Sequence, residues 1–116
     1  MKEINSIPTE FKNTSALFVA LGDEHRQRIL LAFEPNERLN ILQIVAASTL
    51  SRTAVTHHLK ILHQSGALSS EKIGKEVYFW INHQAIIEAF QGVMDYVKQL
   101  QQQEKAEKWS HRFYVY

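Results

Sequence analysis

The 116-residue chain contains no cysteine and only two prolines and four glycines. The lack of cysteine excludes disulfides, thiolate catalysis, cysteine redox sensing and cysteine-ligated zinc. No apolar run approaches the length of a membrane-spanning helix, and the first residues, MKEINSIPTEF, lack the basic-then-apolar layout of a secretion signal. The net charge is only +1, so nucleic-acid binding would depend on where the charges lie. We expect a single cytoplasmic domain over residues 1–116.

Apolar residues at helical spacing predict four helices in the first half of the chain. In chain order they cover about 8–21, 23–35, 41–47 and 51–64. Asp23, Asn40 and Ser51 are good N-cap residues for the last three helices. Asn40 and Gln43 also have the spacing of a capping box, and Gly66 suits the C-terminal end of the fourth helix.

The pattern changes to period two after Gly66. The runs ALSSEKI and EVYFWI predict two short strands joined by a hairpin turn at Gly74 and Lys75. Asn82 then caps a last, long helix. The order of elements is therefore four helices, a β-hairpin and a fifth helix, a mainly α fold with a small β-hairpin.

The segment SRTAVTHHLKILHQSG, residues 51–66, is amphipathic when drawn as a helix. One side is apolar, and the other carries Arg52, Thr53, Thr56, His57 and Lys60. The major groove of DNA admits one α-helix, and Arg or Lys to guanine is the commonest specific base contact. With the short helix and tight connection before it, the segment is typical of the recognition helix of a helix-turn-helix.

The local charge supports the same interpretation. Residues 51–75 contain four basic residues and one acid, Glu71, a local charge of +3 within a chain of total charge +1. Lys72 and Lys75 flank Gly74 at the hairpin tip, where they could reach phosphates beside the groove. Without the helix order, these lysines would indicate only a solvated turn.

The chain resembles the ArsR/SmtB family of winged-helix bacterial repressors in the runs ALGDEHRQRIL, TLSRTAVTHHLKILHQSGAL and GKEVYFWIN. The resemblance covers about residues 15–82. It implies a winged helix-turn-helix fold and a homodimer whose first and last helices form the interface. It also implies a recognition helix in the major groove with a wing beside it. Carried over to the matching positions, the groove-facing residues are Ser51, Arg52, Thr53, Thr56, His57 and Lys60.

One position departs from the family pattern. The family's turn usually has glycine before the leucine, whereas this chain has Thr49. Glycine takes a left-handed conformation at little cost and a β-branched residue does not. Either the turn has another geometry here or it tolerates the strain.

The two metal sites found in the family lack their ligands in this chain. The segment RLNILQI, residues 38–44, has no cysteine pair, and residues 84–103 contain Glu88 and Asp95 but no histidine. No two histidines lie three or four residues apart, as a zinc site on one helix requires. We expect His58 to be a core imidazole hydrogen-bonded to backbone. We expect His57 to be exposed and to contact a phosphate or a base, the alternative being that it is only solvated. No metal or other cofactor is predicted.

Catalytic motifs are also missing. The sequence has no phosphate-binding glycine loop and no G-x-S-x-G motif. Ser51 and His57 are six residues apart and face different sides of a helix. An enzyme is therefore not expected.

The last helix carries a heptad-like seam with spacings of four, three, four and three. The seam consists of Ile86, Phe90, Val93, Val97 and Leu100. We predict a dimer interface formed by Phe11, Phe18, Phe90, Val93, Val97 and Leu100. Trp109, Phe113 and Tyr116, also at helical spacing, either continue this helix or fold back across the dimer.

The resulting prediction is a DNA-binding transcriptional regulator, a repressor that binds an inverted repeat as a homodimer. Two alternatives keep the same fold. One is a sensor that responds to a small molecule or to a metal held without cysteine, and the other is a protein-interaction module that uses the seam on a foreign partner. The effector and the operator sequence are not predicted.

Overall fold

The computed structural model describes residues 1, 5–11 and 13–115, and the side chains of these residues as far as Glu107. Nine elements follow one another in the described part of the chain. They are the 3-10 helix η1 (Thr9–Phe11), α1 (Ser15–Leu21), α2 (Glu24–Leu31), β1 (Leu39–Asn40), α3 (Ile41–Ala47), α4 (Arg52–Gln64), β2 (Leu68–Ile73), β3 (Glu76–Ile81) and α5 (His83–Val115).

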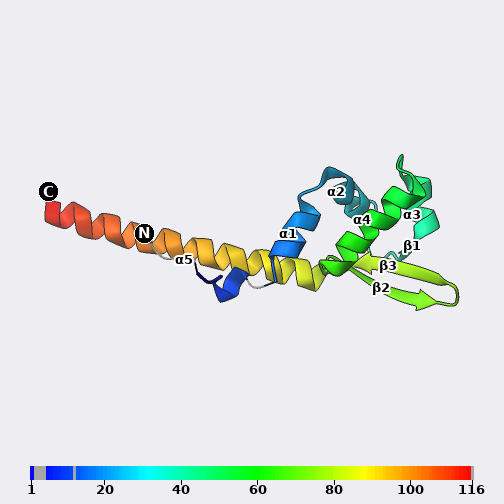
Figure 1. The fold of residues 1–116 in the computed structure, drawn as a ribbon. Coiled ribbons are helices and arrows are strands. Elements are labelled where there is room, and N and C mark those ends of the chain that lie inside the picture. Colours follow the sequence, from blue (N-terminus) through cyan, green and yellow to red (C-terminus); the bar gives the residue numbers. More distant parts are fainter. Residues whose placement is uncertain (2–4, 12, 116) are drawn as a thin grey trace.

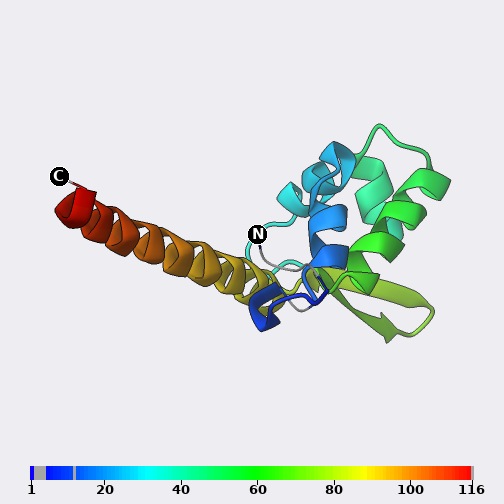
Figure 2. The same ribbon diagram turned by 60° about the vertical axis from the view of Figure 1, so that its left-hand side comes forward.

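The short helices α1–α4 cluster at one end of the molecule beside a small sheet, and α5 projects away from them (Figures 1 and 2). The apolar sides of the short helices and of the sheet meet in one core, since each element has apolar residues at its own period. The buried apolar residues are Leu17, Ala20, Ile29, Ile44, Val55, Leu59, Leu62, Ala67, Leu68 and Phe79.

The capping signals in the sequence mark the element ends correctly. The Asp23 carboxylate accepts the backbone N–H of Arg26 at 3.1 Å, and Asn40 with Gln43 forms the complete capping box at the start of α3. Asn82 Oδ1 accepts the backbone N–H of Ala85 at 3.2 Å in the first turn of α5. Gly66 follows α4 with φ of 87°, the left-handed conformation expected of a C-terminal cap.

The prediction of one helix over residues 8–21 was wrong. η1 ends at Phe11, and Asn13 has a left-handed backbone with φ of 64°, so α1 begins only at Ser15. Thr14, which is buried, precedes α1 and donates its hydroxyl to the Phe11 carbonyl oxygen at 2.7 Å. Asn tolerates the left-handed region, and Asn-Thr-Ser is a run that favours turns and caps over a helix interior.

The predicted two-stranded hairpin is part of a three-stranded antiparallel sheet of order β1-β3-β2. Strands β2 and β3 pair as predicted around the turn at Gly74, whose φ is 63°. The additional strand β1 pairs Leu39 with Phe79 and Asn40 with Tyr78. Two residues are too short a segment to show a period in the sequence, so β1 could not be recognised there. The second predicted helix also ends earlier than expected, at Leu31.

The N-terminal segment packs on the first half of α5. The rings of Phe11 and Tyr96 meet edge to face with centroids 5.3 Å apart, and those of Phe18 and Phe90 lie 5.7 Å apart. Between them Gly92 lies so close to η1 that an added Cβ would stand 2.8 Å from the Glu10 carbonyl oxygen. Helix α5 is therefore joined to the rest of the molecule through its first turns, and its second half projects.

The whole molecule measures 70 × 28 × 23 Å because α5 has 33 residues. Its backbone is helical through Trp109 and Phe113, so the C-terminal segment continues the helix. The side chains of these two residues, and Tyr116, lie outside the described residues. None of the helices in the described part of the chain combines the length and apolar character that crossing a bilayer requires.

Candidate nucleic-acid interface

Helix α4 is held by its apolar side. Val55, Leu59 and Leu62 are almost completely buried, at 0%, 1% and 0% exposure. Each such side chain contributes about 1.5–3 kcal/mol on leaving water, so rotation of α4 about its axis would be strongly opposed. The core therefore fixes which side of α4 faces outward.

All six residues predicted to face a groove are exposed. They are Ser51, Arg52, Thr53, Thr56, His57 and Lys60. Within the described part of the chain, Arg52, Thr53 and Lys60 have no hydrogen-bond or ion-pair partner. Their donors and acceptors are thus available to a ligand that follows α4.

Two of the six use part of their hydrogen-bonding capacity inside the helix. Ser51 Oγ accepts the backbone N–H of Ala54 at 3.2 Å as the N-cap of α4. Thr56 Oγ1 donates to the Arg52 carbonyl oxygen at 2.8 Å. Ser51 therefore retains a hydroxyl donor, and Thr56 retains acceptor capacity and a methyl group.

The turn between α3 and α4 has a geometry that does not require glycine. Ser48 and Ser51 are extended, and Ser48 Oγ accepts the backbone N–H of Leu50 at 2.9 Å. Asn13 and Asn36 are the non-glycine residues with positive φ in the described part of the chain, so Thr49 is not left-handed. The turn therefore has another geometry at Thr49, and no left-handed strain has to be tolerated there.

Lys72 and the two glutamates of the hairpin lie on opposite faces of the sheet. Lys72 pairs with Val77, and both are on the face that includes buried Phe79. Glu71 and Glu76 are on the other face. There Glu71 accepts from Arg38 Nη1 at 3.1 Å, and Glu76 accepts from Asn40 Nδ2 at 2.9 Å and from the Tyr78 hydroxyl at 3.0 Å.

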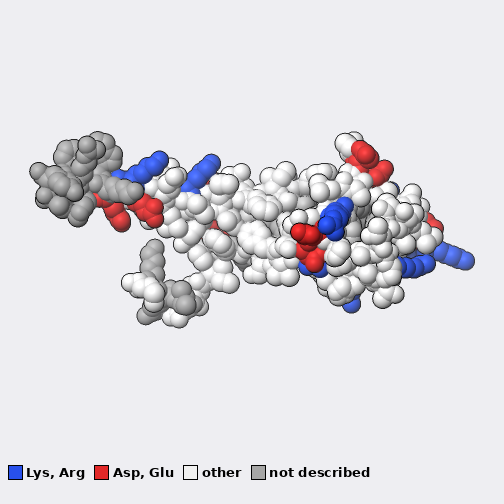
Figure 3. Space-filling view, turned by 90° about the horizontal axis from the view of Figure 1, so that it is seen from above, with Lys and Arg blue, Asp and Glu red and all other residues white. Residues whose placement is uncertain are grey.

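The guanidinium of Arg38 also lies over the Trp80 ring, with its carbon 3.9 Å from the ring centroid. The two hairpin carboxylates are thereby held on the outer face of the sheet. Lys72 and Lys75 remain exposed near the tip. In Figure 3, Lys and Arg atoms project at the end of the molecule where the hairpin lies in Figure 1.

His58 has a different environment from the one predicted. It is half-buried on α4, but its partner is a side chain: Arg26 Nη1 lies 3.2 Å from His58 Nδ1. Burial is the largest cause that lowers the pKa of His58 below 6.5, followed among the lowering causes by the charge of Arg26. Arg26 was missed in the sequence, since nothing within its own helix indicates a buried arginine.

A second exposed surface follows α5. The apolar residues of this stripe are 36–58% exposed, namely Ile87, Phe90, Met94, Val97 and Leu100. Ile87 and Met94 were not predicted, because the chosen heptad seam runs along the adjacent side of the helix. Of the predicted interface residues, Val93 is half-buried, and Phe11 and Phe18 contact α5 of their own chain.

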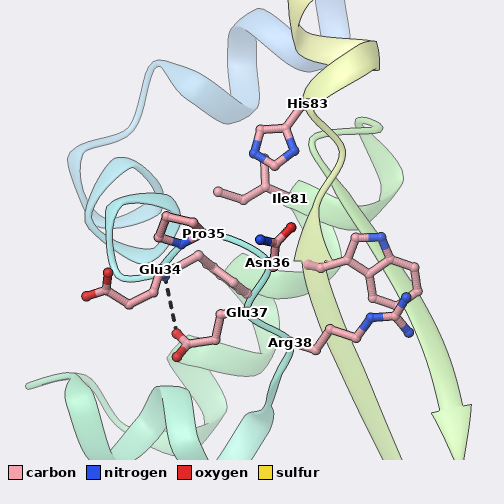
Figure 4. A pocket seen from close by; sticks show the side chains of 9 residues that line it. Glu34, Pro35, Asn36, Glu37, Arg38, Ile81 and His83 are labelled. Carbon is pink, nitrogen blue, oxygen red and sulfur yellow. Dashed lines mark hydrogen bonds between the residues drawn. The ribbon is translucent and has the colours of Figure 1, made fainter.

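A pocket of about 560 Å³ lies where the α2–β1 loop meets the end of β3 and the start of α5 (Figure 4). Glu34, Glu37, Arg38 and His83 contribute polar groups to it, and the Glu37 carboxylate folds back to accept the Glu34 backbone N–H at 3.3 Å. This mixture of charges indicates no single class of ligand. Among the described residues, no cluster of three or more His, Cys, Asp or Glu side chains could hold a metal ion.

A short helix, a tight turn and a second helix, followed by a β-hairpin, define a winged helix-turn-helix protein, with α4 in the position of a recognition helix and β2–β3 in that of the wing. Residues 23–70 match the family model described as bacterial regulatory protein, arsR family. The chain is thus similar to the ArsR/SmtB family, whose matching members are named transcriptional regulators.

Individual relatives are similar over most of the chain. It is 28% identical over 82 residues to the transcriptional repressor SmtB homolog of Synechocystis sp., covering 71% of this chain and 61% of that protein. It is 32% identical over 75 residues to the cadmium resistance transcriptional regulatory protein CadC of Listeria innocua, covering 65% of this chain and 63% of that protein. The chain thus spans about three fifths of the length of these relatives.

The fold has solved counterparts as well. An ArsR-like transcriptional regulator from Rhodococcus sp. RHA1 superimposes with a TM-score of 0.75 over 83% of this chain and 90% of that chain, at 22% identity. At this identity the similarity establishes the fold alone. It confirms the predicted winged helix-turn-helix.

Proposed function

We propose that this chain is a cytoplasmic transcriptional repressor that binds an inverted-repeat DNA site as a homodimer. The observation that carries the proposal is the exposed polar side of α4, where Arg52, Thr53 and Lys60 have no partner among the described residues and whose opposite side is buried in the core. A helix oriented in this way presents a compact set of donors and acceptors to base edges in the major groove. The family supports the proposal, since the SmtB homolog is named a transcriptional repressor.

Base choice is assigned to Arg52, Thr53, Thr56, His57 and Lys60, and phosphate binding to Ser51, Lys72 and Lys75. The face on which each hairpin charge lies supports this division. Glu71, which is ion-paired with Arg38, and Glu76 lie on the face opposite to Lys72, so they oppose phosphates that approach Lys72 less than carboxylates on its own face would.

The homodimer is assigned to the terminal helices of a single domain over residues 1–116. The apolar stripe on α5 includes the predicted Phe90, Val97 and Leu100 and extends to Ile87 and Met94. A contiguous exposed apolar surface on a helix of a small protein indicates an interaction site. A second copy of the chain is the partner that fits, because a two-fold dimer places two recognition helices one DNA turn apart.

Selection of bound duplexes from a random DNA library tests the function. We expect enrichment of an inverted repeat whose half-sites are centred about 10 base pairs, or roughly 34 Å, apart. Sedimentation of the protein alone should give a dimer. A library that shows no enrichment over a protein-free control would overturn the assignment.

Lys75→Ala tests the role of the wing. Because a phosphate contact carries no base information, we expect weaker binding to selected and unrelated duplexes alike. The slope of log affinity against log salt should flatten by up to about one unit. Lys105→Ala on the projecting half of α5 removes the same charge and should leave the slope unchanged. A change in base preference with Lys75→Ala would contradict the assigned role.

A further inference from the structure

Arg26 of α2 is a buried cation that connects three helices. It is only 9% exposed. Its Nε donates to the Ala20 carbonyl oxygen at 2.8 Å, and its Nη2 donates to the Val19 carbonyl oxygen at 3.1 Å. Both carbonyls lie in the last turn of α1, where a helix leaves acceptors unpaired and carries partial negative charge. The remaining nitrogen, Nη1, reaches His58 Nδ1 of α4 at 3.2 Å.

The direction of the last hydrogen bond follows from the chemistry of arginine. A guanidinium only donates, and it does not lose its proton in proteins. His58 Nδ1 must therefore accept, which requires a neutral ring with its proton on Nε2. If His58 gains a second proton, Nδ1 becomes a donor facing a donor, and two positive charges stand in contact.

The charged and titratable groups around His58 come from α2, its N-cap and α4. Burial is the first cause that lowers the His58 pKa, and Arg26, His25 and His57 lower it further. The Asp23 carboxylate acts in the opposite direction without overcoming them. The His25 and His57 rings lie 5.7 Å and 5.8 Å from the His58 ring. Helices α1 and α3 contain no titratable side chain.

We propose that Arg26 is a positioning residue for the recognition helix and that protonation of His58 releases α4 from it, so that DNA affinity falls in acidic solution. The affinity part of this inference rests on the proposed function. The neutral imidazole is the form that the folded state favours. The contribution of this neutral form to the stability of the folded state is complete above about pH 6.5. It is lost as the pH falls through the lowered pKa of His58.

His57 lies one position earlier in the chain and gives the opposite expectation. It is exposed on the side of α4 assigned to DNA. An additional positive charge there would strengthen binding to phosphates. The acid loss of affinity thus belongs to His58, and any acid gain belongs to His57.

His58→Asn tests the proposal, with His57→Asn as the matched control. Asn places an oxygen acceptor where Nδ1 stood and does not titrate. Dissociation constants for the selected duplex are measured at pH 7.5 and 5.5 at constant ionic strength. The wild type should lose more affinity than His58→Asn on acidification, whereas the change His57→Asn should not reduce the loss. An equal loss in wild type and His58→Asn would overturn the proposal.

Two measurements without DNA separate this inference from the proposed function. The midpoint of thermal unfolding should fall more in the wild type than in His58→Asn between pH 7.5 and 5.5. An NMR titration of the wild-type imidazoles should give His58 a midpoint below 6.5. If no duplex is bound at any pH, the proposed function fails, but these two measurements still test whether Arg26 holds a neutral His58. A His58 midpoint at or above 6.5 would contradict the proposed contact.

Discussion

Met94→Glu is expected to convert the proposed homodimer to a monomer and to weaken operator binding by about a hundredfold or more. Met94 is 52% exposed in the middle of the apolar stripe on α5, so the change does not disturb the core of its own chain. In a dimer the buried carboxylates would face each other across the two-fold axis, and an unpaired buried charge is strongly destabilising. Loss of the second recognition helix removes the high effective concentration that linked half-sites provide, a factor of about 10²–10⁴.

Sedimentation and binding to the selected duplex measure the two effects together. Gln99→Glu is the matched control, because it adds the same charge at an exposed position about 140° around the helix from Met94. The control should remain dimeric and bind as the wild type does. If Met94→Glu also sediments as a dimer, the stripe on α5 is not the interface, and a foreign partner becomes the better explanation of it.

Arg52→Ala is expected to lower affinity for the best site by about 1–3 kcal/mol, or roughly five- to 150-fold, and to relax the preference at one base position of each half-site. Arg52 is exposed at the first turn of α4 and has no partner among the described residues. Its bidentate donors are thus available to guanine, and their loss affects one base pair only.

Repeating the selection with the variant measures this directly. Arg28→Ala on α2 removes the same charge from an exposed arginine that pairs with Glu24 at 3.3 Å. Exposed ion pairs contribute about 0–1 kcal/mol, so this control should retain the base preference. Unchanged affinity together with unchanged preference in Arg52→Ala would show that the assignment of roles along α4 is wrong.

The element boundaries that were predicted correctly are those marked by local chemistry. Asp23, Asn40, Ser51 and Asn82 cap the helices they precede, and Gly66 takes the left-handed conformation after α4. A cap satisfies backbone groups within a few residues of itself, so the sequence contains all that is needed to recognise it. The amphipathic pattern of α4 likewise predicted its exposed and buried sides.

The errors fall where distant segments meet. The break at Asn13 lies where the N-terminal segment turns to pack η1 on α5. Strand β1 exists because two residues reach the edge of β3, 38–40 positions later in the chain. The apolar stripe on α5 differs from the predicted seam because contacts with η1 and α1 decide which side of that helix is covered.

By itself, the sequence determined the class of fold and the exposed and buried sides of α4, because capping and helical periodicity depend on neighbours in the chain. The tertiary structure alone decided that Arg38 and Asn40 bind the wing carboxylates and that a buried arginine meets His58 across 32 residues. A charged side chain has no preference of its own for one face or one partner. Its position is set by whichever carbonyls, rings and carboxylates the fold brings to it.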